Sequence, residues 1–524
     1  MIKSRLILWS QLVVIICLLT ACGHTSPTGK AADDKEASQE MSGEAVSADG
    51  EAAPAGEETD SGEREQACED GQNVSNQETP DSVTEIPAPE RAEVIFGDEQ
   101  FEEYLPLLEG KRVALFTNQT GIVGDKTAAE EAEDSGAADE SGTEAGGTGE
   151  DADASVEVDM TLIPFGKDAE GNDITYGQHI LNALIERGVQ VEAVFCPEHG
   201  FRGTKDAGAG VGDSVDEETG VPVVSLYGSD KRGPDAGDMD RFDILLVDIQ
   251  DVGLRYYTYY ITMYSLMDAC AAEGKEVLVL DRPNPNGFYV DGPILQDAYK
   301  SGVGTLPLPV VHGLTLGELA RMINGEGWLE AGEDACDLTV VPCRNYGHQD
   351  KIPLIMRPSP NLKDMRAVYL YSSTCFFENT LVSVGRGTEN PFEIYGSPYL
   401  EGAEGFAFSF TPQSMSGALH PPFEGEICRG VDLREVPIED ILGAGINVSY
   451  LVDAYHAVTE ASPGRSFWGS QDGNGQYWID KLSGSSELRR MIEGGADAEE
   501  IKDSWQEDIE SFRQQRKPYL LYEE

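Results

Sequence analysis

The sequence predicts an α/β protein, in which a Rossmann-like parallel sheet domain is followed by a smaller α+β C-terminal domain. Two observations predict this fold. Short apolar runs alternate with helix-like segments in the first half of the chain, and polar residues gather where the apolar runs end. Continuous apolar strands between helices indicate a parallel sheet that is covered on both faces, and ligands of such sheets bind beyond the carboxyl ends of the strands.

Residues 1–22 have the pattern of a lipoprotein signal peptide. Lys3 and Arg5 precede an apolar run at 6–19, which is too short to span a membrane and closes with Leu-Thr-Ala-Cys. This ending resembles a lipobox, which implies cleavage before Cys22 and lipidation of its sulfur. We therefore expect an extracytoplasmic protein that is lipid-anchored to the cell membrane. A plain signal peptide with a chance cysteine is the alternative.

Composition separates two acidic blocks from the rest of the 524-residue chain. Residues 23–90 and about 125–158 are rich in Ala, Glu, Asp, Ser and Gly, and they carry about half of the formal net charge of −58. Such segments bury too little apolar surface to offset their ordering entropy, so we expect a disordered acidic tether and a disordered acidic insertion. This charge argues against a nucleic-acid partner. The remaining residues are assigned to the sheet domain, 91–302, and the C-terminal domain, 303–524.

Strands and helices alternate along the sheet domain. Its strands are expected at 111–117, 189–195, 221–227, 242–248 and 275–280, with helices at 178–187 and 259–273. No GxGxxG motif follows the first strand, so no dinucleotide or other cofactor is expected. The C-terminal domain is expected to contain a helix at 316–323, strands near 338–341 and 368–371, and a terminal helix at 498–515.

Cysteines are sparse for an exported protein. Seven of them follow Cys22, and none has the CxxC spacing of a zinc or redox site. We therefore expect no metal site and mostly buried free thiols. A disulfide between Cys336 and Cys343 is the alternative.

Polar residues follow four of the expected strands. Because the carboxyl ends of parallel strands lie at one edge of a sheet, these residues are expected to face a common crevice. A single cluster of this kind could equally be a turn or a helix cap. Four clusters at one edge favour a functional site. They are Asn118 and Gln119; Glu198, His199 and Arg202; Asp248, Gln250 and Asp251; and Asp281, Arg282 and Asn284.

From about residue 94 onward, apart from the acidic insertion, the chain resembles the exo-acting β-N-acetylmuramidases of the NamZ type. The resemblance rests on long motifs in a fixed order: FTNQTG (116–121), CPEHGFRG (196–203), DIQDVGLRYYTY (248–259), LDRPNPNG (280–287), RPSPNL (357–362), STCFFENT (373–380) and GRGTENPFEIYGSPY (385–399). It implies a cleft between the Rossmann-like domain and the smaller C-terminal domain, and hydrolysis of the glycosidic bond of N-acetylmuramic acid at the non-reducing end of peptidoglycan fragments.

Glycoside hydrolysis uses one carboxylic acid to protonate the leaving oxygen and a second group at the anomeric carbon. Glu198 and Glu378 are the candidates for this pair, and Asp248 is the reserve candidate. Glu198 has apolar neighbours, Phe195 and Phe201, which suit a general acid. The sequence does not fix which glutamate is the acid, nor whether the reaction retains or inverts configuration or uses the acetamido group of the substrate.

The substrate also carries a lactyl carboxylate, for which guanidinium groups are suitable donors. Arg255, Arg282 and Arg386 stand in the matching motifs, and each could instead be a structural ion-pair partner. Tyr257 is a candidate for stacking on the sugar, although runs of tyrosines more often pack as core. The other predicted substrate-binding residues are Asn118, Gln119, His199, Arg202, Asp281 and Asn379.

The chain departs from the family pattern at three places. Near Asp281 the family usually has Asn-Pro-Leu-Gly-Gly, whereas this chain has Asn284-Pro285-Asn286-Gly287-Phe288. Asn379-Thr380 replaces Gly-Thr-Asn after Glu378, and Glu389-Asn390 replaces a Thr or Ser followed by Arg. Two other functions therefore stay open: a non-catalytic lipoprotein that binds muropeptides, and a hydrolase of another cell-wall bond. No GxSxG elbow or zinc spacing supports the latter. The sequence leaves the oligomeric state open, a homodimer included.

Overall fold

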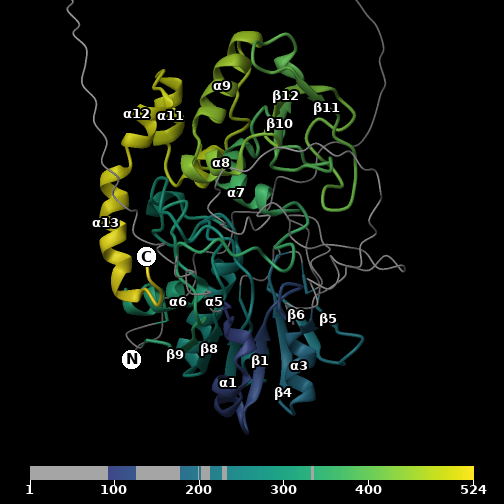
Figure 1. Ribbon diagram of the computed structural model, residues 1–524, viewed down its shortest axis with the longest axis vertical. Helices are drawn as coiled ribbons and strands as arrows, with labels where there is room; N and C mark the ends of the chain where they lie inside the picture. Colours follow the sequence, from purple (N-terminus) through teal and green to yellow (C-terminus); the bar gives the residue numbers. More distant parts are fainter. Residues whose placement is uncertain (1–92, 125–176, 199, 202–212, 227–232, 332–334) are drawn as a thin grey trace, which may run out of the picture. The chain divides into compact units, whose positions relative to one another are not determined.

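The computed structural model describes residues 93–124, 177–198, 200–201, 213–226, 233–331 and 335–524 (Figure 1). The predicted signal peptide with Cys22, the acidic tether and nearly all of the acidic insertion lie outside these residues. Within them, no helix is long and apolar enough to cross a membrane.

A seven-stranded sheet forms the centre of the N-terminal part, with strand order β5-β6-β4-β1-β7-β8-β9. All neighbouring strands are parallel except β5, which is antiparallel to β6. The predicted α/β class with a mostly parallel sheet is confirmed. The strands are β1 (Arg112–Phe116), β4 (Gln190–Cys196), β5 (Ser214–Val215), β6 (Pro222–Ser225), β7 (Ile244–Val247), β8 (Glu276–Leu280) and β9 (Asp337–Val341).

The central strands are apolar on both sides because helices cover both faces of the sheet. In β1, Val113 and Leu115 pack with residues of α1 (Phe101–Leu108) and α3 (Ile180–Glu186). Ala114 and Phe116 belong to the cluster that contains α5 (Tyr259–Glu273) and α6 (Leu316–Gly325). All four β1 side chains are fully buried. This explains why the strands lack the alternating pattern of a half-exposed sheet.

The C-terminal part combines helices with a small antiparallel sheet, in the order β10-β12-β11. Its strands are β10 (Ile394–Ser397), β11 (Phe408–Phe410) and β12 (Cys428–Asp432), and a separate pair joins β2 (Ile122–Val123) to β3 (Gln178–His179). The remaining helices are α4 (Ala236–Met239), α7 (Met365–Thr374), α8 (Ile438–Ala444), α9 (Ser449–Ala461), α10 (Trp478–Ser483), α11 (Glu487–Glu493), α12 (Ala498–Asp503) and α13 (Gln506–Arg516). Single 3-10 turns are η1 (Gly97–Glu99), η2 (Asp297–Tyr299), η3 (Cys375–Phe377), η4 (Pro398–Leu400) and η5 (Lys517–Tyr519).

Three expectations about the second half differ from the structure. The strand expected near 338–341 is β9, which pairs with β8 in the large sheet, so this sheet continues past residue 302. The strand expected at 368–371 lies inside α7, whose start is capped by Asp364 through the backbone N of Ala367 (2.8 Å). The terminal helix is divided into α12 and α13 at Trp505, whose indole N–H donates to Asp291 (2.8 Å).

Other local predictions agree with the structure. Helix α6 begins with a capping box, in which the side chains of Thr315 and Glu318 each accept from the other's backbone N. The six cysteines among the described residues are free and buried, so Cys336 and Cys343 form no disulfide.

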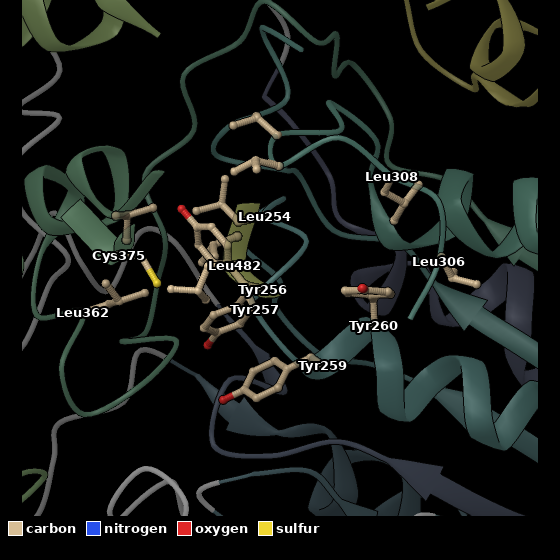
Figure 2. Packing of buried hydrophobic residues seen from close by; sticks show 14 of the residues in the cluster. Leu254, Tyr256, Tyr257, Tyr259, Tyr260, Leu306, Leu308, Leu362, Cys375 and Leu482 are labelled. Carbon is tan, nitrogen blue, oxygen red and sulfur yellow. The ribbon is translucent and has the colours of Figure 1, made fainter. Parts of the chain in front are cut away.

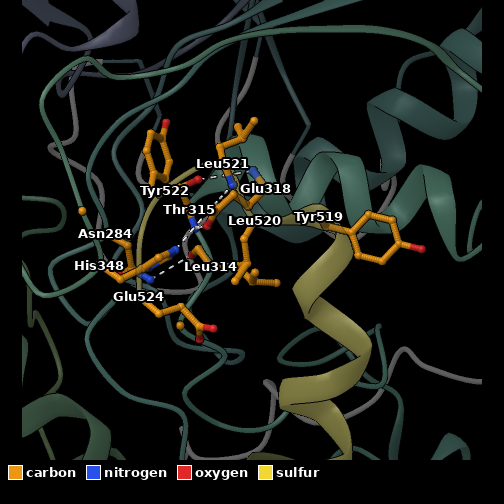
Figure 3. A network of polar contacts seen from close by, with 12 residues as sticks. Asn284, Leu314, Thr315, Glu318, His348, Tyr519, Leu520, Leu521, Tyr522 and Glu524 are labelled. Atoms are coloured by element: carbon orange, nitrogen blue, oxygen red, sulfur yellow. Dashed lines mark hydrogen bonds and ion pairs between the residues drawn. The ribbon is translucent and has the colours of Figure 1, made fainter.

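The last residues of the chain return to the sheet domain beside α6 (Figure 3). The backbone N of Leu521 donates to Glu318 (2.8 Å), and Glu318 also contacts His348 (3.1 Å). The hydroxyl of Tyr522 donates to Asp281, directly after β8. The C-terminal segment thus fixes the end of β8 and the start of α6, which border the edge of the sheet where the polar clusters lie.

Candidate active site

The four predicted polar clusters lie at one edge of the sheet. Strands β4, β1, β7 and β8 are neighbours and run parallel, so their carboxyl ends lie side by side. Asn118 follows β1, Glu198 follows β4, Asp248 follows β7 and Asp281 follows β8. Their side chains nevertheless differ in burial and in hydrogen-bond partners. These differences show which residues can contact a substrate and which stabilise the fold.

Asn118 and Gln119 each use one atom of the side-chain amide group for hydrogen bonds within the protein. Asn118 Oδ1 accepts from the backbone N (2.9 Å) and the hydroxyl (2.6 Å) of Thr120. Gln119 Nε2 donates to the carbonyl oxygens of Arg357 (3.1 Å) and Pro358 (3.3 Å). Among the residues that the structure describes, Asn118 Nδ2 and Gln119 Oε1 have no hydrogen-bond partner. A donor and an acceptor of this kind suit the acetamido and hydroxyl groups of a sugar.

Glu198 lies in the loop after β4 and is half-buried. Its Oε2 accepts a hydrogen bond from the hydroxyl of Thr258 (3.0 Å), the residue that precedes α5. This bond ties the catalytic candidate to the start of a buried helix. His199 and Arg202 lie outside the described residues, so their substrate-binding roles stay predictions.

The loop at residues 357–360 is held against this edge by three side chains. The hydroxyls of Tyr257 (2.6 Å) and Tyr259 (2.7 Å) donate to the carbonyl oxygen of Pro358, which also accepts from Gln119. The rings of the two tyrosines lie next to each other (Figure 2). Tyr257 is 6% exposed, so it is a scaffold residue and does not offer its face for sugar stacking. The motif RPSPNL was recognised in the sequence, yet no residue of it was assigned to the site. Two prolines around Ser359, which restrict the backbone, are the signal that marks this loop as a fixed element.

Glu378 lies directly after η3 and forms an ion pair with Arg386. Arg386 Nε donates to Glu378 Oε1 at 2.7 Å, and the two side chains are 19% and 21% exposed. Burial lowers the pKa of Arg386, but the charge and hydrogen bond of Glu378 outweigh it and leave this pKa above its ordinary value. Arg386 therefore positions the carboxyl group of Glu378 and is not an uncommitted receptor for a substrate carboxylate. Asn379 follows in a left-handed conformation (φ 59°) and is exposed, and its substrate-binding role stays a prediction.

Packed aromatic rings connect the surroundings of the two glutamates. Tyr371 lies edge-on to Tyr257 (6.4 Å between ring centroids) and to Phe392 (4.7 Å). The guanidinium of Arg386 lies 5.0 Å from the centroid of Phe392. Rings in such contacts keep fixed orientations, so this packing fixes the position of the loop that carries Arg386 relative to the start of α5.

Arg255 does not have the predicted substrate-binding role. Its side chain is fully buried and donates to the backbone carbonyl oxygens of Pro293 (2.7 Å), Leu308 (2.6 Å) and Leu482 (2.7 Å). Burial lowers the pKa of Arg255 to about 10. The guanidinium therefore joins three chain segments of the interior, where a substrate cannot reach it.

Asp248 and Arg282 belong to a buried ion-pair cluster with Asp98. Arg282 Nε donates to Asp248 Oδ1 (2.7 Å), and Nη2 donates to Asp98 Oδ2 (2.6 Å) and Asp248 Oδ2 (3.1 Å). All three side chains are at most 2% exposed. Because Asp248 is paired and closed off from solvent, it does not suit the role of reserve catalytic carboxylate. Arg282 is likewise engaged by two carboxylates and does not suit a substrate carboxylate.

Asp281 is a structural residue and not the predicted sugar ligand. Its carboxylate accepts from the hydroxyls of Thr315 (2.6 Å) and Tyr522 and from the backbone N of Gly317 (2.8 Å). It is fully buried, and burial raises its pKa to about 6. Asp281 thus fastens the end of β8 to the first turn of α6 and to the C-terminal segment.

Asp251 is a buried carboxylate with one oxygen in use. Oδ1 accepts from the backbone N of Gly253 (2.7 Å), whereas Oδ2 has no hydrogen-bond partner within the described ranges. Burial raises the pKa of Asp251 to about 7. It lines a small cavity with Ile249, Gln250, Arg282, Pro283, Asn284, Leu314, Thr315 and Leu316.

This carboxylate predicts a pH-dependent stability. The pKa of Asp251 is higher in the folded protein than the ordinary value of 3.8, so its contribution to stability is greatest below about pH 4 and is lost as the pH rises through about 7. Asp251→Asn cannot ionise. We expect its free energy of unfolding to rise relative to that of the wild type between pH 4 and pH 7, by up to about 4 kcal/mol, since one pKa unit corresponds to about 1.4 kcal/mol. Thermal denaturation over a pH series measures this difference, and parallel profiles for the two proteins would contradict it.

The comparisons with known proteins agree with this arrangement. Family models described as exo-β-N-acetylmuramidase NamZ match residues 171–366 (N-terminal model) and 369–522 (C-terminal model). The peptidoglycan β-N-acetylmuramidase NamZ of Bacillus subtilis (strain 168) is 37% identical over 357 residues, which are 64% of this chain and 80% of that protein.

Two crystal structures of DUF1343 family proteins from Bacteroides fragilis NCTC 9343 have a similar fold. The first is 44% identical, with a TM-score of 0.66, and the match covers 83% of this chain and 100% of that chain. The second is 26% identical, with a TM-score of 0.61, and the match covers 82% and 99%.

Proposed function

The chain belongs to the NamZ family of exo-β-N-acetylmuramidases, and we propose that it releases N-acetylmuramic acid from the non-reducing end of peptidoglycan fragments. It is a glycoside hydrolase that acts on peptidoglycan. The observation that carries the proposal is that the N-terminal family model spans Glu198 and the C-terminal model spans Glu378. The match therefore includes both candidate catalytic carboxylates.

The contacts of the two glutamates support different roles in this reaction. Glu378 is paired with a guanidinium at 2.7 Å, which favours a charged carboxylate facing the anomeric carbon. Glu198 accepts from a neutral hydroxyl and has two buried phenylalanines as near neighbours in the chain, which suits a proton donor. In this scheme the bond between the anomeric carbon and the glycosidic oxygen breaks. The proton of Glu198 goes to the leaving sugar, water supplies the new hydroxyl of N-acetylmuramic acid, and the remaining proton of the water returns to the carboxylate pair.

The test is incubation of the protein with the disaccharide MurNAc-GlcNAc, followed by product analysis. We expect release of free N-acetylmuramic acid, and none from the isomer GlcNAc-MurNAc, whose non-reducing end is the other sugar. Proton NMR of the first product then shows whether the configuration is retained or inverted. Binding of MurNAc-GlcNAc without any product would contradict the enzyme and favour the muropeptide-binding lipoprotein.

We also propose that the protein is extracytoplasmic and anchored through a lipid on Cys22. The support is the sequence of residues 1–22, with two cationic residues, a short apolar run and the Leu-Thr-Ala-Cys ending. Such an anchor would keep a hydrolase of cell-wall fragments beside its substrate. Labelling with a radioactive fatty acid tests this directly: the wild type should carry the label and Cys22→Ser should not, and an unlabelled wild type would overturn it.

A further inference from the structure

Lys363 and Glu389 form an ion pair in which the two side chains differ in solvent exposure. Lys363 Nζ lies 2.8 Å from Glu389 Oε2 and donates to the carbonyl oxygen of Thr388 (3.3 Å). The Lys363 side chain is 16% exposed, whereas that of Glu389 is 78% exposed. The ammonium group is therefore held by its surroundings, and the carboxylate that pairs with it can leave into solvent.

Arg357 acts on the same carboxylate. The pKa of Glu389 is lowered, first by its hydrogen bond with Lys363 and its charge, and further by the charge of Arg357. Both cations thus favour a negative group at the position that Glu389 occupies. Only Glu389 regains full solvation when the pair separates, because the Lys363 side chain is 16% exposed, so the ammonium group favours another anion in the place of Glu389. Another carboxylate can consequently replace Glu389 at small cost.

The position of this cation pair relates it to both candidate catalytic glutamates. The carbonyl oxygen of Arg357 accepts from Gln119, at the sheet edge that carries Glu198. Thr388, which contacts Lys363, is two residues from Arg386, the ion-pair partner of Glu378. Lys363 therefore contacts the loop that carries Arg386, and the backbone of Arg357 contacts the sheet edge that carries Glu198.

We propose that Lys363 binds the lactyl carboxylate of the terminal N-acetylmuramic acid, with the charge of Arg357 in support, and that Glu389 is an internal anion which the substrate displaces. This inference rests on the proposed function and deepens it. The lactyl group distinguishes N-acetylmuramic acid from N-acetylglucosamine, so these three residues set the preference for the acidic sugar. The three arginines expected for this task from the sequence are occupied elsewhere, by backbone carbonyls or by buried or half-buried carboxylates.

The test compares ligands that differ only in charge. Affinities of N-acetylmuramic acid and of its neutral methyl ester are measured by calorimetry on the full protein. Lys363→Met should weaken binding of the acid by about tenfold, and Glu389→Gln should strengthen it by about threefold, since charge-assisted contacts have effects of this order. Neither change should alter binding of the ester. The matched controls Lys300→Met and Asp297→Asn break another exposed pair (3.0 Å) and should leave both affinities unchanged.

Kinetics with 4-nitrophenyl β-N-acetylmuraminide provide the second measurement. Lys363→Met should raise KM with little change in kcat, and Glu389→Gln should lower KM. The inference is overturned if the acid and the ester respond equally, or if both variants bind the acid as the wild type does. Failure of the proposed function would give a different result. The wild type would then release no product, while the affinities for the acid and the ester could still be measured.

Discussion

Glu378→Gln and Glu198→Gln should each lower kcat on MurNAc-GlcNAc by about a thousandfold or more, because both carboxylates act on the bond that breaks. KM should change little. The two variants should differ on 4-nitrophenyl β-N-acetylmuraminide, whose leaving group departs without a proton. There Glu198→Gln should keep most of the wild-type rate, and Glu378→Gln should stay inactive. Steady-state rates on the two substrates measure this difference.

The controls for this prediction separate chemistry from folding. Glutamine has nearly the volume of glutamate, and the hydroxyl of Thr258 can still donate to the amide oxygen at position 198. Circular dichroism should therefore show wild-type folding, and Glu404→Gln, at an exposed position, should have wild-type rates. If both catalytic variants keep more than about a tenth of kcat on the disaccharide, the carboxylates are structural, because loss of a general acid or a nucleophile has larger effects.

The large sheet was predictable because its determinants are local. Strand β1 is apolar on both sides, and α6 begins at a capping box, so each element is specified by residues within a few positions of it. The segment 368–371 is also apolar, but a buried helix and a buried strand have the same composition over four residues. Asp364, which caps α7, was the local signal that decides this case.

The candidate site was predictable only to the level of residue type. The sequence places Arg255, Arg282 and Arg386 in the right motifs, but whether a guanidinium meets a substrate depends on partners far along the chain. Arg255 binds Leu482, which is 227 residues away, and Arg282 binds Asp98, which is 184 residues away. The spacing of residues within a motif cannot predict contacts over such distances along the chain. The loop at 357–360 was not assigned for the same reason, since its partner Gln119 lies 238 residues before it.

Arg282→Met should destabilise the protein by about 3–5 kcal/mol, because it leaves two buried carboxylates without their cation. Asp98 and Asp248 are at most 1% exposed, and burial raises the pKa of Asp98 to about 8 even with Arg282 present. Without the guanidinium, charged carboxylates become less favourable still. The folded-state pKa of Asp98 then lies further above that of the unfolded chain, so the loss of stability should grow as the pH rises from 5 to 8. Urea unfolding at both pH values measures it.

Two further variants test whether the unpaired carboxylates cause this loss. Arg112→Met removes a cation of the same type from an exposed pair with Asp243 (2.7 Å), and it should change the stability far less than Arg282→Met at either pH. Adding Asp98→Asn and Asp248→Asn to Arg282→Met removes the buried charges, and it should restore part of the stability and abolish its added pH dependence. If Arg282→Met is as stable as Arg112→Met at pH 8, the cluster does not hold the ends of β7 and β8 in place. The edge that carries the candidate site must then be fixed by the bonds of Asp281 to α6 and Tyr522.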